Sequence, residues 1–80
     1  MIGERMRQAR DLIRPVLEGA AEPLATTQIA ELSGGWQVSV YFALCSLERD
    51  GEVMRAGRVG SSARAEVLWV SVSVFPEETP

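Results

Sequence analysis

Glycines divide the apolar pattern of this chain into short helical segments, which are followed by strands. Apolar residues recur every three or four positions up to Gly34-Gly35, resume at that spacing, and stop again at Gly51. Glycine accepts the left-handed backbone that ends many helices, so each of these positions is expected to end one. Beyond Gly51 the apolar spacing changes to two, which is typical of strands. The pattern predicts a small α+β domain of three helices followed by a two-stranded hairpin.

The first helix is expected to run from the first residues to Ala20, because apolar residues there share one helical face. That face comprises Ile2, Met6, Ala9, Ile13, Val16 and Ala20. The apolar spacing continues past Pro15, which favours a kinked helix over a divided one. Leu24-Ala25, directly after Pro23, is expected to form a short extra strand.

The second helix is expected to begin at Thr26 or Thr27, whose hydroxyl would cap it, and to end at Gly34-Gly35. The third is expected over about 37–50. A helical wheel places one apolar set on a single side of the third helix: Trp36, Val40, Ala43, Leu44 and Leu47.

Two strands are predicted at 52–56 and 67–74, joined by a glycine- and serine-rich loop over 57–64. Alternation in the second strand puts Leu68, Val70, Val72 and Val74 on one face and Trp69, Ser71 and Ser73 on the other. Residues 1–75 are expected to form one domain, and 76–80 a flexible tail.

Composition restricts the chemistry open to this chain. It contains no histidine, no lysine and a single cysteine, Cys45, so the usual general bases, Schiff-base nucleophiles and zinc ligand sets are missing. We therefore expect no enzymatic activity, no cofactor and no metal site. One cysteine cannot form an internal disulfide, and no signal peptide or membrane-spanning stretch is evident, which favours a cytoplasmic protein without membrane association.

Several residues match, in type and spacing, the pattern of a known protein family. They are Pro23-Leu24, Ile29-Ala30-Glu31-Leu32, Gly34, Val40, Leu44 and the run Leu47-Glu48-Arg49-Asp50-Gly51-Glu52-Val53. With the order of helices and strands over about 9–74, they resemble the winged helix-turn-helix superfamily of DNA-binding domains. The chain departs from that family at Gly35, where an apolar residue is usual, and in the third helix, which usually carries arginine or lysine.

The resemblance implies that the third helix enters the major groove of double-stranded DNA. The matching positions of that recognition helix are Gln37, Ser39, Phe42, Ala43 and Ser46. It also implies a wing that contacts the DNA backbone, and residues 55–64 contain three arginines and no acidic residue. The expected wing contacts are Arg55, Arg58, Ser61, Ser62 and Arg64.

The first hypothesis is therefore a small DNA-binding regulator. Such a protein would be a transcriptional regulator of bacterial type, or a phage-type control or recombination accessory factor. A homodimer is expected if its target is palindromic.

A second hypothesis comes from the same helix. No charged residue lies between Trp36 and Leu47, and the formal net charge of the chain is −3, which does not favour nucleic acid. Val38, Phe42 and Cys45 form a second apolar stripe, which would pack against the wing, the first helix or another subunit. The alternative is a protein-interaction or dimerisation module with little DNA affinity. It would dock through Trp36, Val38 and Phe42, or through an acidic face around Glu18, Glu22 and Glu31.

Overall fold

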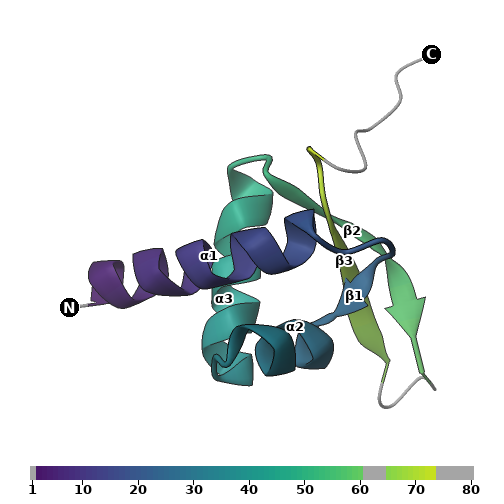
Figure 1. Cartoon of the computed structure of the whole chain (residues 1–80), viewed down its shortest axis with the longest axis horizontal. Helices are drawn as coiled ribbons and strands as arrows, with labels where there is room; N and C mark the ends of the chain where they lie inside the picture. Colours follow the sequence, from purple (N-terminus) through teal and green to yellow (C-terminus); the bar gives the residue numbers. More distant parts are fainter. Residues whose placement is uncertain (1, 61–64, 74–80) are drawn as a thin grey trace.

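The computed structural model describes residues 2–60 and 65–73, apart from the side chain of Ile2. The elements are α1 (Ile2–Glu18), β1 (Leu24–Ala25), α2 (Thr26–Ser33), α3 (Gln37–Arg49), β2 (Val53–Val59) and β3 (Glu66–Ser71). Figure 1 shows α1 lying across α3, with its first turns projecting beyond the rest of the molecule and the sheet at the opposite end. The described residues thus form a small α+β domain, as predicted. The predicted tail over 76–80 lies outside them.

The sheet has three antiparallel strands in the order β1-β3-β2. Leu24 pairs with Trp69 in β3, which confirms the short strand expected after the first helix. On the other side of β3, β2 reaches Val59, three residues beyond its predicted end. A register shift between Arg55 and Gly57 interrupts this pairing, and Gly57 has a φ of 133° that other residues rarely adopt.

The helices begin and end close to where the glycines and apolar spacing predict. α1 continues through Pro15 without a break, which confirms an undivided helix. Gly34 ends α2 with a φ of 75°, and the amide of Gly35 donates to the carbonyl of Ala30 at 3.1 Å. Gly51, after α3, has a φ of 78° and reverses the chain toward β2.

The predicted threonine cap of α2 is wrong. Ala25 is the N-cap residue, and the Gln28 side chain accepts a hydrogen bond from its amide at 2.9 Å. Both threonine hydroxyls are directed to β3 instead. Thr26 Oγ1 accepts a hydrogen bond from Trp69 Nε1, and Thr27 Oγ1 donates one to Glu66 Oε2, each at 3.0 Å.

The core lies between the three helices and one face of the sheet. It consists of Ile13, Leu17, Ile29, Ala30, Val40, Ala43, Leu44, Leu47, Val53 and Trp69. Trp69 is fully buried, so the face of β3 that points into this core carries the tryptophan rather than Leu68. Alternation along the strand predicted two faces but could not decide which of them points inward.

Trp36 is a correction to the predicted core. Its side chain is 81 % exposed, although the helical wheel grouped it with Val40 and Leu44. The reason is that Trp36 precedes α3 in extended backbone, with φ −76° and ψ 137°, so helical geometry does not place its side chain.

Candidate interaction surface

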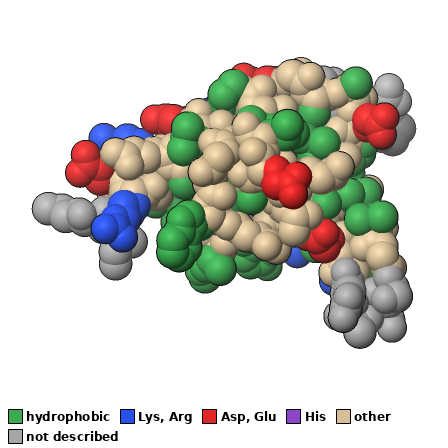
Figure 2. All heavy atoms as spheres, turned by 60° about the horizontal axis from the view of Figure 1, so that its bottom comes forward, with side chains coloured by type: hydrophobic (Ala, Val, Ile, Leu, Met, Phe, Trp, Pro, Cys, Tyr) green, Lys and Arg blue, Asp and Glu red, His purple; other side chains and the backbone are tan. Residues whose placement is uncertain are grey.

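One side of α3 is buried in the core, and the other presents large apolar side chains to solvent. Val38 is 64 % exposed, Phe42 56 % and Tyr41 39 %, and Trp36 lies immediately before them. We call these four residues the α3 surface. Figure 2 shows hydrophobic side chains gathered on the side of the molecule that is the lower edge of Figure 1. Of the predicted apolar stripe, only Cys45 is half-buried and packs on the core.

Two open hollows flank the α3 surface. The larger, of about 630 Å³, lies between α3 and β3. It is lined by Thr26, Gln37, Val38, Tyr41, Phe42, Ala65, Glu66 and Val67. The smaller, of about 180 Å³, lies between α1 and α3 and is lined by Arg5, Met6, Ala9, Ser39 and Phe42. Phe42 lines both, so its ring forms a ridge between them.

Aromatic contacts connect the exposed side of α3 with the core. The centroid of the Tyr41 ring lies 6.0 Å from that of Phe42 and 6.3 Å from that of Trp69, and both pairs have edge-to-face geometry. The guanidinium of Arg55 lies 5.0 Å from the centre of the Trp69 ring. Arg55 Nε also donates to Glu48 Oε2 at 3.0 Å, and this hydrogen bond raises the pKa of Arg55. Tyr41 thus connects the exposed Phe42 ring with the buried Trp69 ring.

The predicted recognition-helix residues separate into two groups. Gln37, Ser39 and Phe42 are exposed, and Ser46 is half-buried. Ala43 is fully buried. Its assignment to a DNA contact is wrong, because its methyl group lies on the core side of α3 and reaches no groove.

The predicted wing residues are only partly described. Arg58 is exposed on β2 and forms no ion pair with another residue in 2–60 or 65–73. Arg55 is held by Glu48 and by the Trp69 ring, as above, so its guanidinium is already occupied. Ser61, Ser62 and Arg64 lie outside the described residues.

A second group of arginines fastens α1 to the connection between α3 and β2. Arg10 contacts Asp50 at 2.6 Å and Glu52 at 3.2 Å. Arg14 contacts Glu52 at 2.8 Å and Asp11 at 2.7 Å. The hydrogen bond from Arg14 holds the pKa of Glu52 below its ordinary value, despite the opposing effect of burial. These ion pairs are structural and leave Arg10 and Arg14 engaged within the domain.

Sequence reasoning missed several residues that line the hollows. Tyr41 follows Val38 by three positions, so the helical spacing that identified Val38 and Phe42 also includes it. No local pattern identifies Glu66, because its place beside Thr27 depends on the pairing of β3 with β1. Arg5, Met6 and Ala9 reach the site only because α1 lies across α3.

Within the described residues, no cluster of side chains is suited to hold a metal ion, and no helix has the length and apolar character needed to cross a membrane. Comparisons with protein-family models, with curated proteins and with solved structures find no match for this chain.

Proposed function

We propose that this chain is a protein-interaction module with winged helix-turn-helix architecture, and that the α3 surface docks its protein partner. The observation that carries the proposal is the exposure of Trp36 directly before, and of Val38 and Phe42 on, the helix that DNA-binding members of that superfamily insert into the major groove. The element order and the sheet order β1-β3-β2 support the architecture.

Large apolar side chains grouped in solvent favour a protein partner. Aromatic residues are enriched in the cores of protein interfaces, whereas charged residues are depleted there. The α3 surface has this composition, with three aromatic residues and one valine. Removing apolar surface from water contributes roughly 25 cal/mol per Å², so covering these side chains favours association.

The same surface is poorly suited to DNA. The phosphates that border a major groove attract arginine and lysine, and α3 carries no basic residue before Arg49. Glu66 lines the larger hollow and places a carboxylate beside Val38 and Phe42. Arg55 is already paired with Glu48.

DNA binding through the hairpin is the second candidate, because Arg58 is exposed on β2 and Gln37 and Ser39 are exposed near the start of α3. In this arrangement the hairpin would hold the DNA backbone. A small regulatory protein of bacterial or phage type, as predicted from the resemblance, would act in this way.

Selection of peptides from a random display library tests the proposed function. We expect the wild-type domain to enrich apolar peptides, and Phe42→Ser and Val38→Ser to abolish the enrichment while circular dichroism shows a folded domain. Val59→Ser is the matched control, because Val59 is 51 % exposed on β2. Equal enrichment by Phe42→Ser, or no enrichment by a wild type that is monomeric in solution, would overturn the proposal.

Fluorescence anisotropy with random duplex DNA tests the second candidate. DNA binding predicts an affinity that falls with salt, with a logarithmic slope of about −0.9 per neutralised phosphate. Arg58→Ala should then weaken binding to all sequences. We expect no such binding. Salt-dependent binding that both Arg58→Ala and Phe42→Ser reduce would replace the protein-interaction proposal with the DNA-binding one.

A further inference from the structure

We propose that the partner of the α3 surface is a second copy of this chain, bound in a two-fold symmetric dimer in which Arg5 of each copy faces Glu31 of the partner subunit. This inference rests on the proposed function and deepens it, because it names the occupant of the surface. Charge complementarity across an apolar centre supports this dimer.

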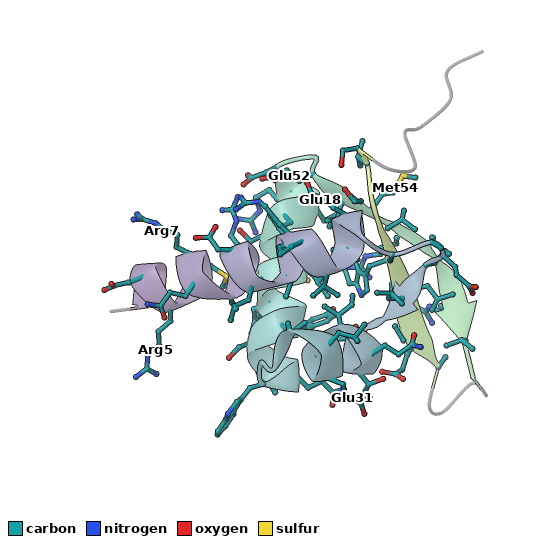
Figure 3. The ribbon with its side chains drawn as sticks, viewed as in Figure 1. Arg5, Arg7, Glu18, Glu31, Glu52 and Met54 are labelled. Carbon is teal, nitrogen blue, oxygen red and sulfur yellow. The ribbon has the colours of Figure 1, made fainter. Side chains whose placement is uncertain are left out.

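Charges of opposite sign flank the α3 surface. Arg5 projects from α1 and lines the hollow between α1 and α3, whereas Glu31 is exposed on α2. Figure 3 shows both side chains directed to the same side of the molecule, with the turn between α2 and α3 lying between them. On this side, Figure 2 shows basic side chains at one end with an acidic one beside them, hydrophobic side chains near the middle, and further acidic side chains toward the other end.

A two-fold dimer brings opposite ends of such a face together. The two-fold axis lies in the contact plane and is perpendicular to the line from Arg5 to Glu31. The Arg5 end of one copy then meets the Glu31 end of the other copy. Every Arg5 then faces Glu31 of the partner subunit, and the pair forms twice. A surface surrounded by charges of one sign would repel its own copy, so the opposed signs favour self-association.

The apolar centre of the face fits the middle of this interface. Trp36 belongs to the turn between α2 and α3, which Figure 3 shows between Arg5 and Glu31, so the proposed symmetry axis passes near this turn. Its 81 % exposed indole would become covered by the same region of the second copy. Central aromatic residues commonly supply most of the binding energy of an interface, while charges at the rim determine which partner and which orientation are accepted.

Charge reversal and mixing test the arrangement by sedimentation velocity. We expect the wild type to dimerise, and Arg5→Glu and Glu31→Arg each to weaken dimerisation by about tenfold or more, because like charges then face each other twice. An equimolar mixture of these two variants should dimerise again. In the mixed dimer each substituted side chain faces one of opposite charge.

Control variants come from α1, the helix that carries Arg5. Arg7 and Glu18 are exposed on α1, and Figure 3 shows neither beside the turn between α2 and α3. Arg7→Glu and Glu18→Arg should therefore leave the dimer unchanged. If the mixture of Arg5→Glu and Glu31→Arg stays as monomeric as its components, or if Arg7→Glu weakens the dimer equally, the proposed pairing is overturned.

Tryptophan emission provides an independent readout. Trp69 is buried in each copy, so a blue shift of the emission as protein concentration rises reports the covering of Trp36. A dimer that forms without this shift uses another surface and overturns the inference. A monomer at all concentrations also overturns it. The proposed function then still stands if peptide selection depends on Phe42, and falls as well if it does not.

Discussion

Trp69 connects β3 to three neighbouring elements. Its indole nitrogen donates to Thr26 at the start of α2, and its ring contacts Tyr41 of α3 and lies beneath Arg55 of β2. The side chain is fully buried, so the hydrogen bond of its single polar atom matters more than an exposed one would.

Thr26→Val is expected to destabilise the domain by about 1–3 kcal/mol, because it keeps the shape of the side chain but leaves the indole N–H of Trp69 buried without an acceptor. Thr26→Ser retains the hydroxyl and is the matched control. Urea unfolding followed by circular dichroism measures the difference. Equal stability of the two variants would show that this hydrogen bond does not contribute.

The lowered pKa of Glu52 predicts how the stability of the domain changes with pH. The hydrogen bond from Arg14 lowers the pKa of the Glu52 carboxyl in the folded state below its ordinary value of 4.5. The resulting stabilisation is complete above that value and is lost as the pH falls through the lowered pKa. Since the Glu52 side chain is 41 % exposed, solvent screening limits the effect to less than about 1 kcal/mol.

Glu52→Gln should therefore lower the free energy of unfolding near neutral pH and reduce its decline in acid. Urea unfolding at neutral pH and near pH 3 checks this. Glu18→Gln, also exposed, is the control. An undiminished loss of stability in acid for Glu52→Gln would assign that loss to other carboxylates.

At the scale of elements, α1 carries an unfavourable residue in its interior. Proline has no backbone N–H, so Pro15 cannot donate to the carbonyl of Asp11, four residues earlier, and its ring crowds that carbonyl. Its side chain is exposed, so it fills no space in the core. The helix is held in place instead by buried Ile13 and Leu17.

Pro15→Ala is expected to raise the free energy of unfolding by about 1–3 kcal/mol, because it restores the missing hydrogen bond. Gly3→Ala, on the same helix with nothing within 4 Å of the new Cβ, controls for a general gain in helix propensity. Thermal unfolding of both variants distinguishes the effects. A loss of stability in Pro15→Ala would mean that the backbone geometry fixed by proline is needed to seat α1 on α3.

The sequence predicted the bounds of the helices and strands better than it predicted which side chains are buried and what they contact. The glycines that end α2 and α3, the undivided α1 and the short β1 all follow from local backbone preferences. The use of the Thr26 and Thr27 hydroxyls, the inward face of β3 and the exposure of Trp36 do not. Each depends on residues distant in the chain or on backbone outside a helix, which periodicity does not describe.

The candidate site was predictable to a similar extent. Helical spacing identified Val38 and Phe42 as a second apolar stripe, but it could not decide between burial and exposure, which depends on how far α1 extends over α3. Ala43 was assigned both to the core and to a DNA contact, and its complete burial agrees only with the core assignment. Arg55 was predicted to contact DNA because its hydrogen-bond partner Glu48 lies seven residues earlier, on the other side of the turn at Gly51.

At the scale of the whole molecule, the proposed self-association through the α3 surface would couple stability to concentration. Binding that occurs only in the folded state raises the unfolding temperature as protein concentration increases. The wild-type Tm is therefore expected to rise with concentration, whereas the Tm of Arg5→Glu should rise less over the same range. Differential scanning calorimetry over a concentration series measures this. A wild-type Tm independent of concentration would argue against the dimer.

The order β1-β3-β2 has a consequence for synthesis on the ribosome. β3 follows both of its neighbours in the chain, so neither β1 nor β2 has a pairing partner until residues 66–71 have left the exit tunnel. Until then the helices also lack Trp69, around which they pack. A nascent chain thus carries unpaired strand edges from the emergence of β1 until β3 follows, and its folding is expected in one late step that begins when the central strand emerges.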